Sequence, residues 1–111
     1  MKRVLVIALL LGLVAVAAAQ KGNTGRLLTG KVIDKQDNPV PKAIVYLTDL
    51  RTRAVKTYIV GDDGGYRFPA MSAAVDYEVY AQFNGKKSDT KTVSQFDNRS
   101  QVNINLRVDT R

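Results

Sequence analysis

The sequence predicts an all-β fold, an antiparallel β-sandwich of about seven strands, and three observations carry this prediction. Short runs of alternating apolar and polar residues recur after residue 26. Turn-forming residues separate these runs at intervals of roughly 8 to 12 residues. No stretch after residue 19 has helical periodicity, so the helices that parallel crossovers need are missing. Such spacing within one small domain is typical of an immunoglobulin-like sandwich.

Three segments show a two-residue alternation, which places one set of side chains in the core and the other set on the surface. In residues 100–108 the set expected inside is Val102, Ile104, Leu106 and Val108. In residues 76–83 the inward set is Tyr77, Val79, Ala81 and Phe83, opposite Glu78, Tyr80 and Gln82. In residues 43–49 we expect Ala43, Val45 and Leu47 inside, and a partly covered face made of Ile44, Tyr46 and Thr48.

Shorter strands are predicted from Leu27, Lys56 and Tyr66 onward. The turns between strands are residues 37–41, residues 61–65 and the pair Asn84-Gly85, which favours a two-residue hairpin. Residues 86–94 are polar on both faces apart from one valine. This composition predicts an edge strand whose lysines discourage pairing with another molecule.

Residues 1–19 have the pattern of a secretory signal peptide. After a positive start, residues 4–19 carry no charged side chain, and Ala17 and Ala19 match the A-x-A pattern of a cleavage site before Gln20. The alternative is a retained membrane anchor, but a span needs about 20 apolar residues, and no cluster of charge follows this shorter run. We therefore expect an exported protein, periplasmic or extracellular after cleavage near Ala19/Gln20, with membrane contact only through the uncleaved signal.

The expected organisation is a signal peptide (1–19), a flexible N-terminal segment (20–26), one β-sandwich domain (27–108) and a C-terminal tail (109–111). Cleavage leaves 92 of the 111 residues, which is enough for one core and too few for two domains. Loss of Lys2 and Arg3 leaves 15 basic and 10 acidic residues, a formal charge of +5. Because the chain has no cysteine, burial and hydrogen bonding must stabilise the fold without disulfides.

Two segments, residues 30–47 (GKVIDKQDNPVPKAIVYL) and residues 61–71 (GDDGGYRFPAM), resemble the carboxypeptidase regulatory-like domain. The family pattern is a strand G-x-V-x-D, a turn N/G-x-P-V/I-x-x-A, a strand, and then D-x-x-G-x-Y/F. The matching residues of the first half are Gly30, Val32, Asp34, Asn38, Pro39, Val40, Ala43 and Val45. Those of the second half are Asp62, Gly65, Tyr66 and Phe68, and the spacing is one residue shorter than the family pattern at Asn38-Pro39 and at Gly65-Tyr66. The resemblance implies a transthyretin-like fold, and it extends over nearly the whole mature chain.

Each motif residue has a role in folding. Pro39 and Pro41 stiffen the first turn, and the small Ala43 lets the next strand pack closely. Asn38 stands where the family often has glycine, and asparagine tolerates a positive φ. Gly64 and Gly65 reverse the chain in the second turn, where we expect Asp62 to supply a side-chain cap. The alternative, that Asp62 and Asp63 bind calcium, is weaker because calcium usually takes six to eight oxygens.

The residue types argue against catalysis and against a cofactor. The sequence contains no histidine and no cysteine, which removes Ser-His triads, thiol nucleophiles and nearly all zinc or iron sites. Asp76 and Glu78 share a strand face, but two neighbouring acids alone specify no substrate. Hydroxyisourate hydrolase and the intradiol dioxygenases resemble the expected architecture only, because their histidine-containing sites have no counterpart here. In the metallocarboxypeptidases a separate domain carries the zinc. We predict no catalytic, cofactor-binding or metal-binding residues.

Basic residues gather in two places, Arg51, Arg53 and Lys56 around one turn and Lys86, Lys87 and Lys91 along another segment. They could attract an anionic glycan or lipid headgroups at the envelope. They could equally serve solubility, because acidic residues are interleaved with them. The sequon-like Asn98-Arg99-Ser100 matters only if the host glycosylates. No nucleic-acid partner is expected.

Two functions remain. The first, which we prefer, is a non-catalytic structural or adhesive module that binds protein or carbohydrate in the cell envelope. The second is an accessory subunit that stabilises or localises a partner enzyme, such as a carboxypeptidase-like enzyme, or an outer-membrane transporter. A monomer or weak self-association through an edge strand is expected.

Overall fold

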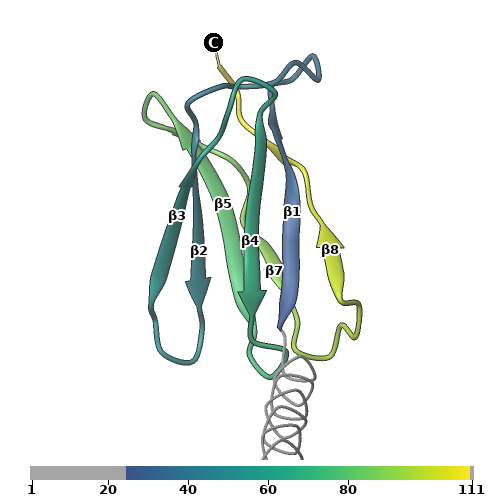
Figure 1. Cartoon of the computed structure of the whole chain (residues 1–111). Helices are drawn as coiled ribbons and strands as arrows, with labels where there is room; N and C mark the ends of the chain where they lie inside the picture. Colours follow the sequence, from purple (N-terminus) through teal and green to yellow (C-terminus); the bar gives the residue numbers. More distant parts are fainter. Residues whose placement is uncertain (1–24, 111) are drawn as a thin grey trace, which may run out of the picture.

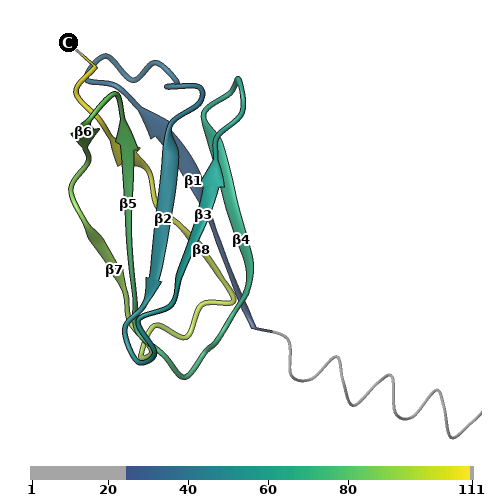
Figure 2. The same cartoon turned by 90° about the vertical axis from the view of Figure 1, so that its left-hand side faces the viewer.

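The computed structural model describes residues 25–110 and shows two β-sheets packed face to face (Figures 1 and 2). The predicted signal peptide and residues 20–24 lie outside the described residues. The strands are β1 (Arg26–Ile33), β2 (Ile44–Asp49), β3 (Val55–Ile59), β4 (Gly65–Met71), β5 (Tyr77–Phe83), β6 (Lys86–Lys87), β7 (Lys91–Val93), β8 (Gln101–Asn103) and β9 (Leu106–Arg107). The predicted all-β sandwich is confirmed. Each of the seven predicted strand regions forms, and the last two are each divided into two short strands.

The first sheet has the order β4-β1-β8, and β9 also pairs with β1. The β1–β4 pairing is antiparallel, as predicted, but β8 and β9 run parallel to β1, which the sequence analysis did not predict. The cause is the loop between Val93 and Gln101, which carries the chain from the second sheet to the first. It returns to the end at which β1 begins, where the Leu27 N–H donates to the Ser100 carbonyl. A crossing between two sheets gives parallel strands without a helix.

The second sheet has the order β3-β2-β5-β6, with β7 also pairing with β5, and all of its pairings are antiparallel. Its registers place Tyr46 of β2 opposite Thr57 of β3 on one side and Tyr80 of β5 on the other. Because side chains alternate along a strand, these three residues lie on the same outward face. In the described residues no helix is present that could cross a membrane.

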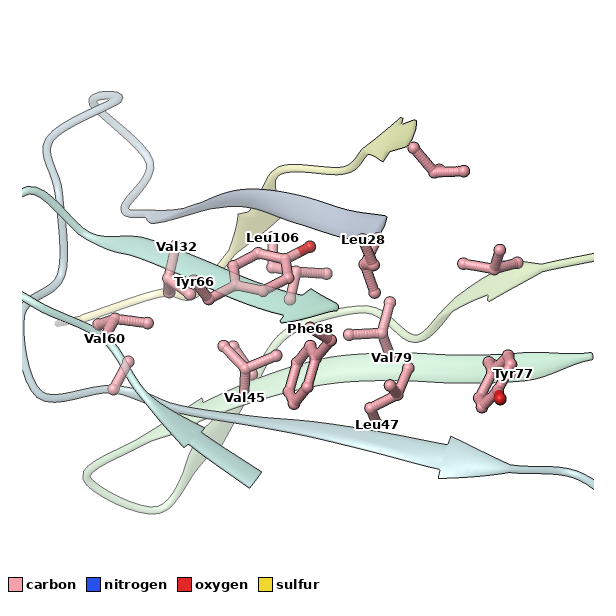
Figure 3. Packing of buried hydrophobic residues seen from close by; sticks show 14 of the residues in the cluster. Leu28, Val32, Val45, Leu47, Val60, Tyr66, Phe68, Tyr77, Val79 and Leu106 are labelled. Carbon is pink, nitrogen blue, oxygen red and sulfur yellow. The ribbon is translucent and has the colours of Figure 1, made fainter. Parts of the chain in front are cut away.

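The core lies between the two sheets and contains the inward residues of β1, β2, β4 and β5, together with buried residues of β7, β8 and β9 (Figure 3). The predicted inward sets of residues 43–49 and 76–83 are buried, except that Phe83 is only partly buried. Ile44, Tyr46 and Thr48 are half-buried, as expected. In the last segment Val102, Leu106 and Val108 are buried, whereas Ile104 is only partly buried against the core. The prediction of a core position was therefore wrong for Ile104.

The break at Ile104 has a specific cause in Gly30 and Tyr66. The Tyr66 ring packs beside Gly30, and its hydroxyl donates a 2.5 Å hydrogen bond to the Ile104 carbonyl. A Cβ on Gly30 would lie 1.8 Å from that carbonyl oxygen and 2.9 Å from Cε1 of Tyr66. The side chain of Asn105 then replaces a backbone acceptor, since its Oδ1 accepts from the Lys31 N–H at 3.0 Å. The predicted continuous strand is thus divided into β8 and β9.

Two details of the predicted turns need correction. In the turn before β4 the cap is Asp63, not Asp62, because Asp63 Oδ1 accepts from the Gly65 N–H at 2.9 Å. This i to i+2 bond is an Asx turn, and Gly64 between the two residues has a φ of 77°. In the turn after β1 the residue with positive φ is Asp37 (67°), one position before Asn38. Asp34 Oδ1 caps that turn by accepting from the N–H groups of Gln36 and Asn38.

Candidate ligand-binding face

The outer side of the second sheet is the candidate site. Figure 2 shows β2, β3 and β5 lying in front of the first sheet, with no other described segment across them. The outward positions of β2, β5 and β6 place five side chains together there, and we call this set the tyrosine face. It consists of Ile44, Tyr46, Tyr80, Gln82 and Lys87.

The two tyrosines and the lysine form an ordered row. The rings of Tyr46 and Tyr80 are directly opposite across β2 and β5, stacked with centroids 4.9 Å apart and planes at 14°. Lys87 Nζ lies 4.3 Å from the centroid of the Tyr80 ring. An aromatic pair contributes roughly 0.5–1.5 kcal/mol, and an exposed cation–π contact about 0.5–1 kcal/mol. Because these contacts hold the side chains before binding, a ligand would immobilise little that is not already ordered.

A hollow of about 540 Å³ adjoins this row, next to the β5–β6 hairpin. Its lining combines the outward residues of β2 and β5 with the hairpin turn, namely Lys42, Ile44, Tyr46, Gln82, Phe83, Asn84 and Gly85. The predicted Asn84-Gly85 turn is confirmed, with φ angles of 50° and 77° that suit the twist of a two-residue hairpin. The volume lies within the range of small-molecule sites, roughly 300–1,000 Å³.

The chemistry of this lining suits a polar ligand with flat apolar faces. Gln82 and Asn84 offer amide donors and acceptors, Lys42 contributes a charged group to the lining, and Lys87 lies over the neighbouring Tyr80 ring. Ile44 and the tyrosine rings supply apolar contact. Tyrosine is enriched at binding surfaces because one side chain provides both apolar area and a hydrogen-bonding hydroxyl.

A second, smaller hollow of about 90 Å³ lies at the open side of the sandwich between β3 and β4. Leu47, Phe68, Met71 and Tyr77 form its apolar lining, and Asp49 and Lys56 stand beside them. It is below the size of an ordinary small-molecule site.

The two predicted basic clusters are not brought together. Arg51 and Arg53 lie in the turn between β2 and β3, and Lys56 lies on β3 at one edge of the second sheet. Lys86, Lys87 and Lys91 lie on β6 and β7 at the opposite edge of the same sheet. Of the six residues, Lys87 belongs to the tyrosine face. The two predicted basic clusters therefore lie at two separate edges of the second sheet.

Two of the acidic candidates, Asp63 and Asp76, hold backbone groups in place. Asp76 Oδ1 accepts from the Gln95 N–H at 2.6 Å, and Asp63 Oδ1 accepts from Gly65. Asp49 Oδ1 accepts hydrogen bonds from the backbone N–H groups of Thr52 and Arg51. These bonds lower the pKa of the Asp49 carboxyl, and the bond from Thr52 has the larger effect. Residues 25–110 contain no group of three or more acidic side chains placed to hold a metal ion.

Sequence reasoning missed a buried arginine at the end of the sandwich opposite the β5–β6 hairpin. Arg26 is 4% exposed and donates to four backbone carbonyls, those of Ser94, Asp97, Ser72 and Val75, at 2.8–3.1 Å. It thereby ties two loops to the start of β1. Close by, a bidentate hydrogen bond from Arg99 lowers the pKa of Asp97 to about 2. No local pattern marks Arg26, because an arginine within the predicted flexible segment, residues 20–26, is expected to be a surface residue.

Residues 28–108 match the sequence pattern described as the carboxypeptidase regulatory-like domain. The chain belongs to this family. The match covers most of the described residues, and the structure gives the family's motif glycine and tyrosine a shared role at the Gly30–Tyr66–Ile104 contact. No curated protein sequence matches the chain.

Several solved structures share the fold. The major pilin subunit of Bacillus cereus aligns with a TM-score of 0.61 at 16% identity, over 78% of this chain and 30% of the pilin. Catechol 1,2-dioxygenase from Acinetobacter aligns with a TM-score of 0.59 at 10% identity, over 78% of this chain and 53% of the enzyme. The dioxygenase domain of a fusion of a dioxygenase with a carbohydrate-binding protein from Streptomyces aligns with a TM-score of 0.55 at 15% identity, over 80% of this chain and 83% of that domain. At these identities the likeness concerns the fold, and the chain spans about a third of the pilin and half of the catechol enzyme.

Proposed function

We propose that this carboxypeptidase regulatory-like domain is a non-catalytic exported module that binds an anionic glycan of the cell envelope through its tyrosine face. The observation that carries the proposal is the row Tyr46, Tyr80 and Lys87, pre-ordered on a sheet face that no other described segment covers. The Tyr80 ring lies between Tyr46 and Lys87, so a sugar ring would pack its flat C–H face on Tyr46, and the amides of the adjoining hollow suit its hydroxyl groups. Lys42 and Lys87 would pair with the acidic groups of the polymer.

Two further features support the proposal, one for a non-catalytic role and one for export. The sequence contains no histidine and no cysteine, and Asp76, one of the two carboxylates considered for catalysis, accepts a hydrogen bond from the Gln95 N–H. Export is supported by the pattern of residues 1–19, a positive start followed by an uncharged apolar run and an A-x-A cleavage motif.

The test is affinity electrophoresis of the mature protein in gels that contain heparin, alginate or neutral dextran. We expect retardation by the two anionic polymers and none by dextran. Tyr46→Ala and Tyr80→Ala should each abolish most of the retardation, and Lys87→Ala should weaken it. Lys91→Ala is the matched control, because it removes the same charge from the same sheet edge without touching a ring, and it should leave most of the retardation.

Equal losses in Lys87→Ala and Lys91→Ala would show that binding follows net charge and would contradict the assigned face. Unretarded migration of the wild type in all three gels would contradict the glycan proposal. In that case, stoichiometric recovery of one enzyme or transporter from envelope extract would favour the accessory-subunit function.

A further inference from the structure

The edge strand β3 is open along its whole length. All five of its residues are exposed, including three large apolar side chains, Val55 at 55%, Tyr58 at 38% and Ile59 at 69%. β3 pairs with β2 on one side, and in the sheet order it has no strand on the other. Apolar residues along an unpaired edge favour association with another strand.

The hydrogen-bond pattern shows which backbone groups of β3 are available. Beside its ends, the Ala54 carbonyl accepts from Asp49 and the Val60 N–H donates to the Ala43 carbonyl. Because bonded and non-bonded pairs alternate in an antiparallel ladder, Lys56 and Tyr58 also bond to β2. The N–H and C=O groups of Val55, Thr57 and Ile59 therefore point away from the sheet, toward the open edge.

The other three sheet edges formed by residues 25–110 are each blocked. β4 contains Pro69, which lacks an N–H, and a register shift at Ala70, whose φ is 61°. The opposite edge of the second sheet is split into β6 and β7 and carries Lys86, Lys87 and Lys91. The other edge of the first sheet is broken between β8 and β9. β3 has a single lysine, Lys56, and neither a proline nor a break.

We propose that β3 binds the β3 strand of a second copy of this chain, antiparallel and centred on Thr57. The five-residue strand is self-complementary in that register. On the outward face, Val55 lies opposite Ile59 of the second copy, and Thr57 lies opposite Thr57 of the second copy. On the inward face, Lys56 lies opposite Tyr58 of the second copy, so the one charge of the strand meets an aromatic ring rather than its own equivalent.

The symmetry of this pairing bears on the tyrosine face, although the dimer does not depend on the glycan proposal. An antiparallel pair of identical edge strands has its two-fold axis perpendicular to the sheet. The two second sheets then form one continuous sheet, and both tyrosine faces lie on its same side. A polymeric ligand could contact both faces at once, and the second contact would be intramolecular. One pair of five-residue strands is short of a standard stable interface, so the dimer is weak and concentration-dependent.

The first experiment is analytical ultracentrifugation of the mature protein over a series of concentrations, without glycan. We expect a reversible monomer–dimer equilibrium. Thr57→Lys places two ammonium groups opposite each other at the two-fold axis and should raise the dissociation constant about tenfold or more. Thr92→Lys is the matched control, because it makes the same change at an exposed outward position of β7, and it should leave the equilibrium unchanged.

The register is tested by single cysteines in this cysteine-free chain. Residues directly opposite in a bonded pair have Cα atoms about 5.5 Å apart, within the range of a disulfide. Thr57→Cys should therefore form a disulfide-linked dimer on mild oxidation. Val55→Cys should not, because its counterpart in the second copy lies four residues along, about 13 Å away.

A sedimentation profile that stays monomeric at the highest soluble concentration would overturn the proposal. Equal dissociation constants for Thr57→Lys and Thr92→Lys, or disulfide formation by Val55→Cys as readily as by Thr57→Cys, would also overturn it. Thermal melts of every variant confirm that each folds, and the glycan result has no bearing on any of these outcomes.

Discussion

Replacing Gly30 with alanine should strongly destabilise the domain, because a methyl group has no room there. The added Cβ would lie 1.8 Å from the Ile104 oxygen, 2.7 Å from the Ile104 carbonyl carbon and 2.9 Å from Cε1 of Tyr66. Two of these atoms are backbone, so a change of side-chain rotamer cannot relieve the overlap. Either the junction of β8 and β9 moves away from β1, or the Tyr66 ring and its hydrogen bond to Ile104 are displaced.

The magnitude follows from those two costs. Overpacking a well-packed site costs about 1–3 kcal/mol, and losing the Tyr66 hydroxyl bond costs about 0.5–1.5 kcal/mol. We therefore expect a loss of about 2–4 kcal/mol, against a total stability of roughly 5–15 kcal/mol for a small domain. For a domain of this size the corresponding fall in melting temperature is about 10–30 °C.

The assay is thermal unfolding followed by far-ultraviolet circular dichroism, with urea unfolding as the second measurement. Gly61→Ala is the matched control, because a Cβ at Gly61 would meet only Asp63 Oδ1, at 3.7 Å. It should shift the melting temperature by no more than a few degrees. If Gly30→Ala and Gly61→Ala melt within a few degrees of each other, the close approach of Gly30 to Ile104 does not constrain the fold, and the explanation for the strand break fails.

Four further predictions concern the core, the buried arginine and the dependence of stability on pH. Leu106→Asp places a charge at a fully buried position and should prevent folding. Asn103→Asp changes an exposed position and should leave stability nearly unchanged. Circular dichroism checks both variants. Arg26→Ala leaves four backbone carbonyls without their donor and should lower the free energy of unfolding, measured with urea, by about 2–4 kcal/mol. An unchanged urea midpoint would contradict the role of Arg26 in holding the two loops to β1. Burial raises the pKa of the Tyr66 hydroxyl above its ordinary value of 10.0. The contribution of Tyr66 to the free energy of unfolding is therefore complete below pH 10 and is lost as the pH rises beyond it. Unfolding measured over alkaline pH should show a shallower loss of stability in Tyr66→Phe than in the wild type. The hydrogen bond from Arg99 lowers the pKa of Asp97 from 3.8 to about 2. The contribution of Asp97 to stability is therefore present above pH 3.8 and is lost as the pH falls through 2. Unfolding measured over acidic pH should show a smaller loss of stability in Asp97→Asn than in the wild type.

Alternation and turn chemistry were sufficient to predict the sandwich. The inward sets of residues 43–49 and 76–83 and the hairpin at Asn84-Gly85 depend on local sequence, because a strand's faces and a hairpin's φ angles are set by neighbouring residues. The parallel pairing of β8 and β9 with β1 depends instead on the path of a loop between sheets, which no local pattern encodes.

Long-range contacts explain the other differences. Ile104 fits the apolar alternation, but the Tyr66 hydroxyl, 38 residues away in sequence, binds its carbonyl where the strand breaks. Ser88 occurs in a polar segment, yet it is buried because its Oγ accepts from the Ala81 N–H and donates to the Asp89 carbonyl. The positions of polar residues that satisfy distant backbone groups are visible only once the sheets are assembled.

The tyrosine face was predicted in part. The sequence placed Tyr46 on a partly covered face and Tyr80 on an outward face, and it named Lys87 among the basic residues. It did not bring the three together, because the cross-strand register between β2 and β5 is set by the fold as a whole. Their stacking and the adjoining hollow follow from that register.

The most direct test of the glycan-binding proposal is a titration of the isotopically labelled mature protein with heparin-derived oligosaccharides, followed by two-dimensional NMR. We expect saturable shifts confined to the tyrosine face and its hollow, above all at Tyr46, Tyr80 and Lys87. Shifts centred on Arg51 and Arg53, or a spectrum that does not change, would contradict it.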